Sequence, residues 1–272
     1  MKFTAEQLQE NWDKLINIVE TTFEGERKEN LLQMYEYFKE RAMFAPASGV
    51  VYYHNAIPGG YVDHILNITE CCTKIYEMWK EMGAHTDEYT LENVIFCALH
   101  HDLGKLGDMT EDYYVPNESE WHRINQGKMY EYNDKLHYMT VTDRAVWLLN
   151  EFGIKMNQIE YLALRLTDGM YEEANKGYLM GFGEGKNLKT NLPLILHQGD
   201  MMATRLEKER YMFSKDSSIN YSEILNPELK EERQKEEKKS VDNIKKAISE
   251  EKTPDILSEK SKDLFDELFG DK

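Results

Sequence analysis

Residues 90–105 read TLENVIFCALHHDLGK, and the rest of the chain is interpreted outward from them. Thr90 is a typical residue at the start of a helix. One face of the predicted helix is apolar, through Val94, Ile95, Cys97 and Ala98. His101 shares that face and should point inward, whereas His100 is rotated by about 100° and should pack or support the site. We expect the helix to end near Gly104.

The end of this helix has the composition of a metal site. His101 and Asp102 are neighbours at a helix end, so both can turn toward one ion, and divalent metals accept imidazole and carboxylate ligands. Gly104 would let the backbone approach the site closely. Lys105 then follows at a position from which its ammonium could reach a phosphate oxygen.

Helical periodicity recurs on both sides of this segment, and alternating strand patterns are nearly absent. Thr4 and Gln7 form a predicted capping box, and residues 44–60 form a predicted loop rich in proline and glycine. The sequence therefore predicts an all-α fold. The further helices are expected at about 4–19, 31–38, 60–79, 142–152, 157–171 and 192–211.

The bulk composition limits the classes of partner. The 272-residue chain has a formal net charge of −17, which disfavours long-range attraction to nucleic acid and slightly favours small substrates. Cys71, Cys72 and Cys97 form no CxxC pair and are expected to be buried thiols. Neither a signal segment nor a membrane-spanning run is apparent, so we expect a cytoplasmic protein without a membrane partner.

The pattern His-Asp-x-Gly-Lys at residues 101–105 closely resembles the signature of the HD phosphohydrolase superfamily. The resemblance implies an earlier histidine ligand, matched by His64, and a later aspartate ligand, matched by Asp200. It also implies an HD-domain helical bundle at 44–212, with N-terminal helices at 1–43 packing on its core. Residues 213–272 would be a charged, partly disordered helical tail.

A narrower resemblance, to HD-domain 3′–5′ exoribonucleases, rests on residues 44–48, Tyr53-His54 and Pro58-Gly59-Gly60. That branch implies further metal ligands, and His122 is at about the first such position. At the next position the branch usually has histidine, and this chain has Asp168, which leaves a complete second metal site in doubt. Lys105, His54 and Arg123 are the candidate substrate contacts. The alternatives are a loop hydrogen bond for His54 and a surface salt bridge for Arg123.

The resemblance implies hydrolysis of a nucleotide phosphate ester, with Asp102 and Lys105 in catalytic roles. One or two divalent ions (Mn, Fe, Co, Ni, Zn or Mg) would supply the nucleophile from water. Two alternatives stay open: a 3′–5′ exonuclease acting on the 3′ end of a single-stranded nucleic acid, and a non-catalytic nucleotide-binding module.

The terminal segment at 261–269 reads SKDLFDELF and is similar to the sliding-clamp-binding peptides that end phage DNA polymerases. The likeness would fit a phage-encoded enzyme in the host cytoplasm, tethered to a clamp. The alternative is a terminal helix that packs on its own domain or on a second copy in a homo-oligomer.

Overall fold

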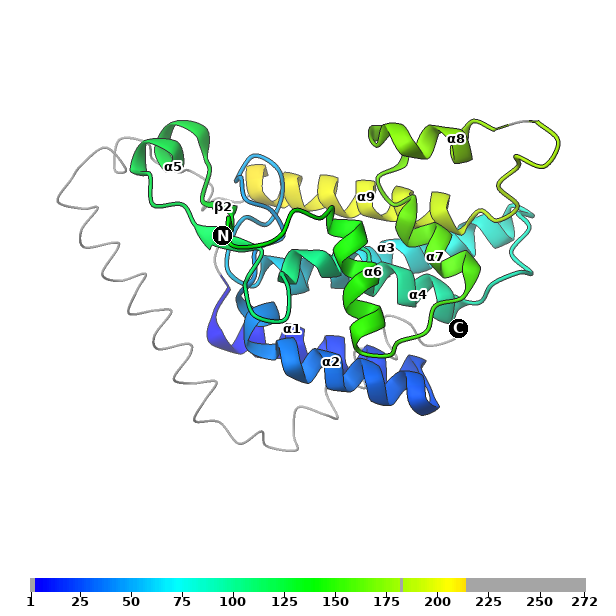
Figure 1. Ribbon diagram of the computed structural model, residues 1–272, viewed down its shortest axis with the longest axis horizontal. Coiled ribbons are helices and arrows are strands. Elements are labelled where there is room, and N and C mark those ends of the chain that lie inside the picture. The colour runs from blue at the N-terminus through cyan, green and yellow to red at the C-terminus, as the bar shows by residue number, and fades with distance from the viewer. Residues whose placement is uncertain (1–2, 182, 214–272) are drawn as a thin grey trace.

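The computed structural model describes residues 3–181 and 183–213 as a predominantly helical protein (Figure 1). The sequence-based expectations for the helical tail and for the clamp-like segment at 261–269 lie outside the described residues. The α-helices are α1 (Ala5–Thr22), α2 (Gly25–Phe44), α3 (Gly60–Glu81), α4 (Leu91–His100), α5 (Glu120–Gln126), α6 (Val141–Glu151), α7 (Gln158–Arg165), α8 (Lys176–Leu179) and α9 (Leu192–Phe213). Short 3-10 helices follow at η1 (Leu103–Leu106), η2 (Gly169–Tyr171) and η3 (Glu173–Asn175).

Helix starts agree with the capping signals in the sequence. Thr4 and Gln7 form the predicted capping box of α1, and Thr90 forms a second one with Asn93 at the start of α4. The side-chain oxygen of each N-cap residue accepts a hydrogen bond from a backbone N–H that the first helical turn leaves unpaired. Pro193 lies in the first turn of α9, where a missing N–H is tolerated.

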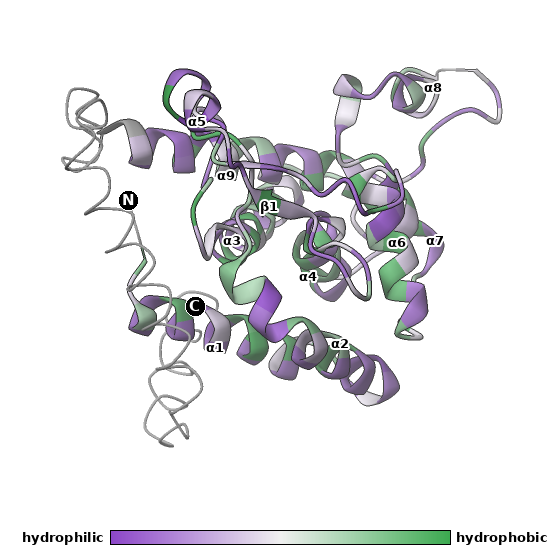
Figure 2. Ribbon diagram, turned by 60° about the vertical axis from the view of Figure 1, so that its left-hand side comes forward, coloured by the Kyte–Doolittle hydropathy of each residue, from purple (hydrophilic) through white to green (hydrophobic). Residues whose placement is uncertain are grey.

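Helices α3, α4 and α9 form the centre of the molecule. Helix α3 packs along both of the others, while α1 and α2 form an antiparallel layer on one side and α6 and α7 cover another (Figure 1). A continuous apolar core runs from Leu8 in α1 to Ala203 in α9. Hydrophobic residues gather where α3 and α4 cross, and the outer helices are more hydrophilic (Figure 2). The three thiols are buried, as expected.

The predominantly helical fold agrees with the helical class expected from the sequence, and one small sheet accompanies it in the described part of the chain. Strands β1 (Tyr114–Pro116) and β2 (Tyr130–Tyr132) pair antiparallel, with Tyr114 opposite Tyr132. Each strand is only three residues long and is stabilised by cross-strand aromatic pairs, so no alternating pattern is long enough to detect. One sequence-based expectation is wrong: Gly104 does not end α4 but lies inside η1.

Candidate metal centre

Four of the predicted ligands meet where α3, the end of α4 and α9 come together. The Nε2 atom of His64 on α3 lies 3.4 Å from Oδ2 of Asp102 and 3.6 Å from Oδ1 of Asp200 on α9. Nε2 of His101 lies 3.4 Å from the same Oδ2 atom of Asp102. One potential ligand atom from each of His64, His101 and Asp102 falls within 4.8 Å of the others. The fold thus brings together His64 and Asp200, which lie 38 and 98 positions from Asp102 in the sequence.

His64 and His101 both direct Nε2 toward Oδ2 of Asp102. Nδ1 of His101 is 2.9 Å from the backbone carbonyl of Ala98, and Nδ1 of His64 is 3.1 Å from each carboxylate oxygen of Glu207. These acceptors favour a proton on Nδ1 of each ring. The two Nε2 atoms are buried and have no hydrogen-bond partner in the described part of the chain. Buried ring nitrogens need a partner, and a cation between them would provide one.

The backbone after α4 turns Asp102 toward the same point as His101. His101 keeps helical dihedral angles as the C-cap residue, and Asp102 then adopts φ −104° and ψ 10° before η1 begins. Gly104 lets η1 approach the start of α6, because a Cβ atom at this position would lie 2.0 Å from the carbonyl oxygen of Val141. The glycine of the motif therefore serves a close backbone contact and not a helix stop.

Lys105 is hydrogen-bonded to the candidate ligand Asp102. Its Nζ donates to Oδ2 of Asp102 at 2.6 Å and to the backbone carbonyl of Ala47 at 2.8 Å. Burial alone would raise the pKa of Asp102, but the positive charges of Lys105 and then His101 outweigh it and hold that pKa well below its usual range. Asp102 is therefore a carboxylate, as a metal ligand must be, and one of the three ammonium protons of Lys105 is left for another acceptor.

The surroundings of His64 are strongly negative. Burial would lower the pKa of His64, but the negative charge of Glu207, its hydrogen bond to Nδ1 and the nearby carboxylate of Asp102 raise it to about 10. Carboxylates that favour a proton on this ring equally favour a divalent cation beside it. The donor set, two imidazoles and two carboxylates, suits first-row transition metals and Zn better than Mg.

Glu207 adjoins the candidate ligands but is not among the residues singled out from the sequence. It is 2% exposed, and it follows Asp200 by seven residues, so the two carboxylates share one face of α9 two turns apart. A buried carboxylate without a partner is costly, so an acidic residue on the apolar face of a helix is itself a signal. That spacing was present in the sequence but was masked by the surrounding charged residues.

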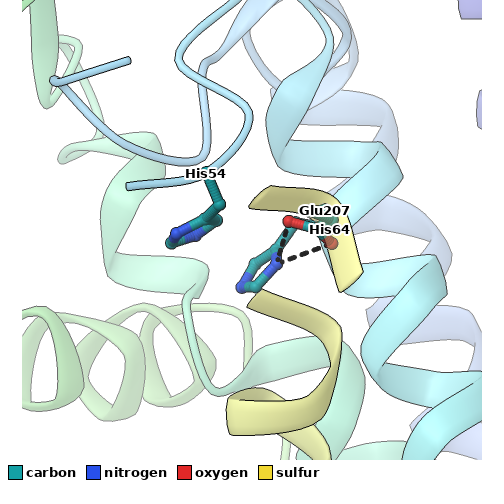
Figure 3. Close-up of side chains that lie close together, drawn as sticks. All are labelled: His54, His64 and Glu207. Atoms are coloured by element: carbon teal, nitrogen blue, oxygen red, sulfur yellow. Dashed lines mark hydrogen bonds and ion pairs between the residues drawn. The ribbon is translucent and has the colours of Figure 1, made fainter. Parts of the chain in front are cut away.

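His54, a predicted substrate contact, lies over His64 (Figure 3). The two ring centroids are 4.4 Å apart, and neither ring nitrogen of His54 has a hydrogen-bond partner among the described residues. Burial, followed by the charges of His64 and Lys105, lowers the pKa of His54 to about 2, so the ring is neutral. A second cluster of potential ligands, His54, His64 and Glu207, adjoins the first.

Asp168 lies near the centre but outside the close clusters. Partial burial and then the negative charges of Asp102 and Asp200 raise its pKa, so it faces the same region. Its turn is attached to α9 through His197, whose Nδ1 is 2.7 Å from the carbonyl of Thr167. Among the described residues, the groups of closely spaced potential ligands do not include Asp168.

His122 and Arg123 lie apart from these clusters, on α5. The β-bridge between Val50 and Lys128 attaches the α5 segment to the loop before α3, and the guanidinium of Arg123 donates to the carbonyl of Asn117. The structure does not bring His122 together with the other predicted ligands. His85 and His137 are exposed, as expected for surface residues.

The segment at 175–191 lies at a feature separate from the candidate ligands. Together with α7 it encloses a cavity of about 540 Å³, and no candidate site residue lines that cavity. No helix in the described part of the chain is long and apolar enough to cross a membrane.

No protein-family model, curated protein or solved structure matches this chain significantly.

Proposed function

We propose that this chain is a metal-dependent phosphohydrolase of the HD type that hydrolyses a phosphate ester of a nucleotide. The observation that carries the proposal is the pair of buried Nε2 atoms, on His64 and His101, which converge on Oδ2 of Asp102 and have no hydrogen-bond partner among the described residues. The order His64, His101-Asp102, Asp200 supports the resemblance to the HD superfamily.

His64, His101, Asp102 and Asp200 would hold the metal. When bound, a divalent ion at such a site lowers the pKa of coordinated water and polarises a phosphoryl oxygen. Lys105 holds Asp102 ionised and in place, and its remaining N–H can donate to a phosphoryl oxygen as negative charge builds up there. His54 is neutral, so its ring offers one donor and one acceptor to the substrate.

The test combines metal content with hydrolysis. Purified protein would be loaded with Mn²⁺ and assayed against nucleotides, cyclic nucleotides and short labelled single strands. We expect stoichiometric metal and turnover of at least one nucleotide, and a loss of about 100-fold or more in both metal affinity and turnover in the His101→Ala/Asp102→Ala variant. His137→Ala, an exposed histidine, is the matched control and should behave as wild type.

Equal metal uptake by the wild type and the double variant would refute the metal centre. Absence of both stoichiometric metal and turnover in the wild type would favour the alternative of a non-catalytic nucleotide-binding module.

The runner-up, a 3′–5′ exonuclease on single strands, is favoured by exposed aromatic side chains around the loop before α3 and the small sheet. Tyr53, Trp121 and Tyr132 are 63%, 59% and 68% exposed, and Tyr132 stacks on Tyr114 at 5.8 Å between ring centroids. Tyr114 lies close to the centre, since Lys105 and Asp102 both influence its pKa. Exposed aromatic rings stack successive bases without sequence preference.

Stepwise shortening of the labelled strands would favour a 3′–5′ exonuclease over an enzyme that hydrolyses mononucleotides. We expect Trp121→Ala to weaken binding of a single strand by 5- to 100-fold, about 1–3 kcal/mol per stacked base, and to leave hydrolysis of a mononucleotide unchanged. Equal effects of Trp121→Ala on strands and on mononucleotides would contradict an extended binding surface.

A further inference from the structure

Glu207 is the first member of a chain of polar contacts behind the metal centre. Both of its carboxylate oxygens accept a hydrogen bond from the N–H at Nδ1 of His64. The side chains of His64 and Glu207 are each 1% exposed. With a proton held on Nδ1, Nε2 is the ring nitrogen that a metal could bind, and it faces Asp102 and Asp200. Figure 3 shows His64 between His54 on one side and Glu207 on the other. The orientation of His64 thus depends on a residue from another helix.

Asn67 continues the chain from α9 into α3. Its amide nitrogen donates to Oε1 of Glu207 at 2.8 Å and to Oδ2 of Asp63 at 3.0 Å. Its amide oxygen accepts from the guanidinium of Arg210 at 3.3 Å. Both amide hydrogens and the oxygen are therefore in use, which fixes the position of Asn67 and with it the carboxylate of Glu207.

Asn55 connects this chain to the loop that carries His54. Its amide nitrogen donates to Oδ2 of Asp63 at 2.8 Å. Its φ is +40°, and in the described part of the chain no other residue except glycine has a positive φ. The carbonyl of Asn55 accepts from the N–H of Ala47 at 3.1 Å, and a Cβ atom on Gly60 would lie 2.1 Å from that carbonyl oxygen. The turn next to His54 is therefore held in an uncommon conformation by the hydrogen bonds with Asp63 and Ala47 and by close packing against Gly60.

We propose that Glu207, Asn67, Asp63 and Asn55 are positioning residues, which orient His64 directly and His54 through the turn at Asn55. That the oriented rings serve a metal and a substrate rests on the proposed function. The buried carboxylate of Glu207, the partly buried carboxylate of Asp63 and a left-handed asparagine all cost stability, and apolar residues of similar volume would pack this interior more favourably. Apolar residues, however, could not hold a proton on Nδ1 of His64.

The first arm of the test uses α9. In wild type, the Nδ1 proton of His64 should give a downfield, slowly exchanging proton NMR signal with or without Zn²⁺. Glu207→Ala should abolish that signal and weaken Zn²⁺ affinity, measured calorimetrically, by about 10- to 100-fold. Glu207→Gln, which keeps an acceptor oxygen, should restore part of both. Glu209→Ala removes an exposed carboxylate from the same helix and should change neither.

The second arm uses the turn. Asn55→Gly tolerates the positive φ but loses the contact with Asp63, so it should keep the urea midpoint of wild type while it shifts or broadens the ring resonances of His54. Asn55→Ala should lose the same contact and also lower the urea midpoint, because alanine is strained at this φ. Unchanged His54 resonances in Asn55→Gly would overturn the link to this turn.

The two proposals fail differently. If wild type binds no metal, the proposed function is wrong, yet the Nδ1 signal of the metal-free protein still tests the positioning chain. If Glu207→Ala keeps both that signal and the Zn²⁺ affinity of wild type, the positioning chain is refuted and the metal centre stands.

Discussion

At the residue scale, the motif glycine illustrates how closely the backbone around the centre is packed. A Cβ atom on Gly104 would lie 2.0 Å from the carbonyl oxygen of Val141, and 3.1 Å from Cβ of Arg144. A backbone carbonyl at the start of α6 cannot rotate away as a flexible side chain would. The substitution would therefore have to displace η1, which carries Lys105, or the start of α6.

We expect Gly104→Ala to lower the free energy of unfolding by about 1–3 kcal/mol or more, as overpacking does. It should also weaken metal binding, because Asp102 and Lys105 flank this position. Urea denaturation followed by circular dichroism measures the first effect. Gly177→Ala is the control, since nothing lies within 4 Å of its Cβ position. A wild-type urea midpoint in Gly104→Ala would show that α6 can move aside.

At the scale of elements, a buried ion pair joins three helices. The guanidinium of Arg27 on α2 lies 2.7 Å from the carboxylate of Glu160 on α7, and 3.9 Å from the ring centroid of Phe96 on α4. Asn93 on α4 donates to the same carboxylate at 2.9 Å. Because the side chain of Glu160 is 1% exposed, these partners take the place of water around its carboxylate.

Removal of Arg27 alone would leave that buried carboxylate without its cation. Arg27→Met should therefore cost about 3–5 kcal/mol of unfolding free energy, measured from urea midpoints. Adding Glu160→Gln should recover part of the loss, because the buried charge is gone while a hydrogen-bonding side chain remains. Lys14→Met removes only a surface pair with Glu10 and should change stability by less than about 1 kcal/mol. No recovery in the double variant would argue against a charge effect.

At the scale of the whole molecule, the candidate ligands come from α3, the end of α4 and α9, which are also the central helices of the core. An ion that binds the folded chain and not the unfolded chain must stabilise the fold as a whole. At 100 times its dissociation constant, such an ion contributes about 2.7 kcal/mol.

We therefore expect Mn²⁺ to raise the thermal midpoint and a chelator to lower it again, as measured by differential scanning calorimetry. The His101→Ala/Asp102→Ala variant should show no response to either. An equal rise in this variant would place the stabilising ion elsewhere on the acidic surface.

Local signals in the sequence were sufficient for most helices. The capping boxes at Thr4 and Thr90 act within four residues, so the starts of α1 and α4 could be predicted without knowledge of the fold. The inward orientation of His101 also followed from helical periodicity, because its face is set by neighbours on the same helix. His64 and Asp200 were predicted only from the family resemblance.

Only the tertiary structure decided which residues that are distant in sequence lie at the site and which lie away from it. The contacts of Glu207 with His64 and Asn67 join residues more than 130 positions apart, and no local pattern encodes such pairs. The placement of His122 on α5, away from the close ligand clusters, depended on the small sheet, whose strands are too short to detect. The sequence by itself determined which helices form and which donor atoms exist. Packing of α9 against α3 decided which of those atoms meet, because that contact is made between residues remote along the chain.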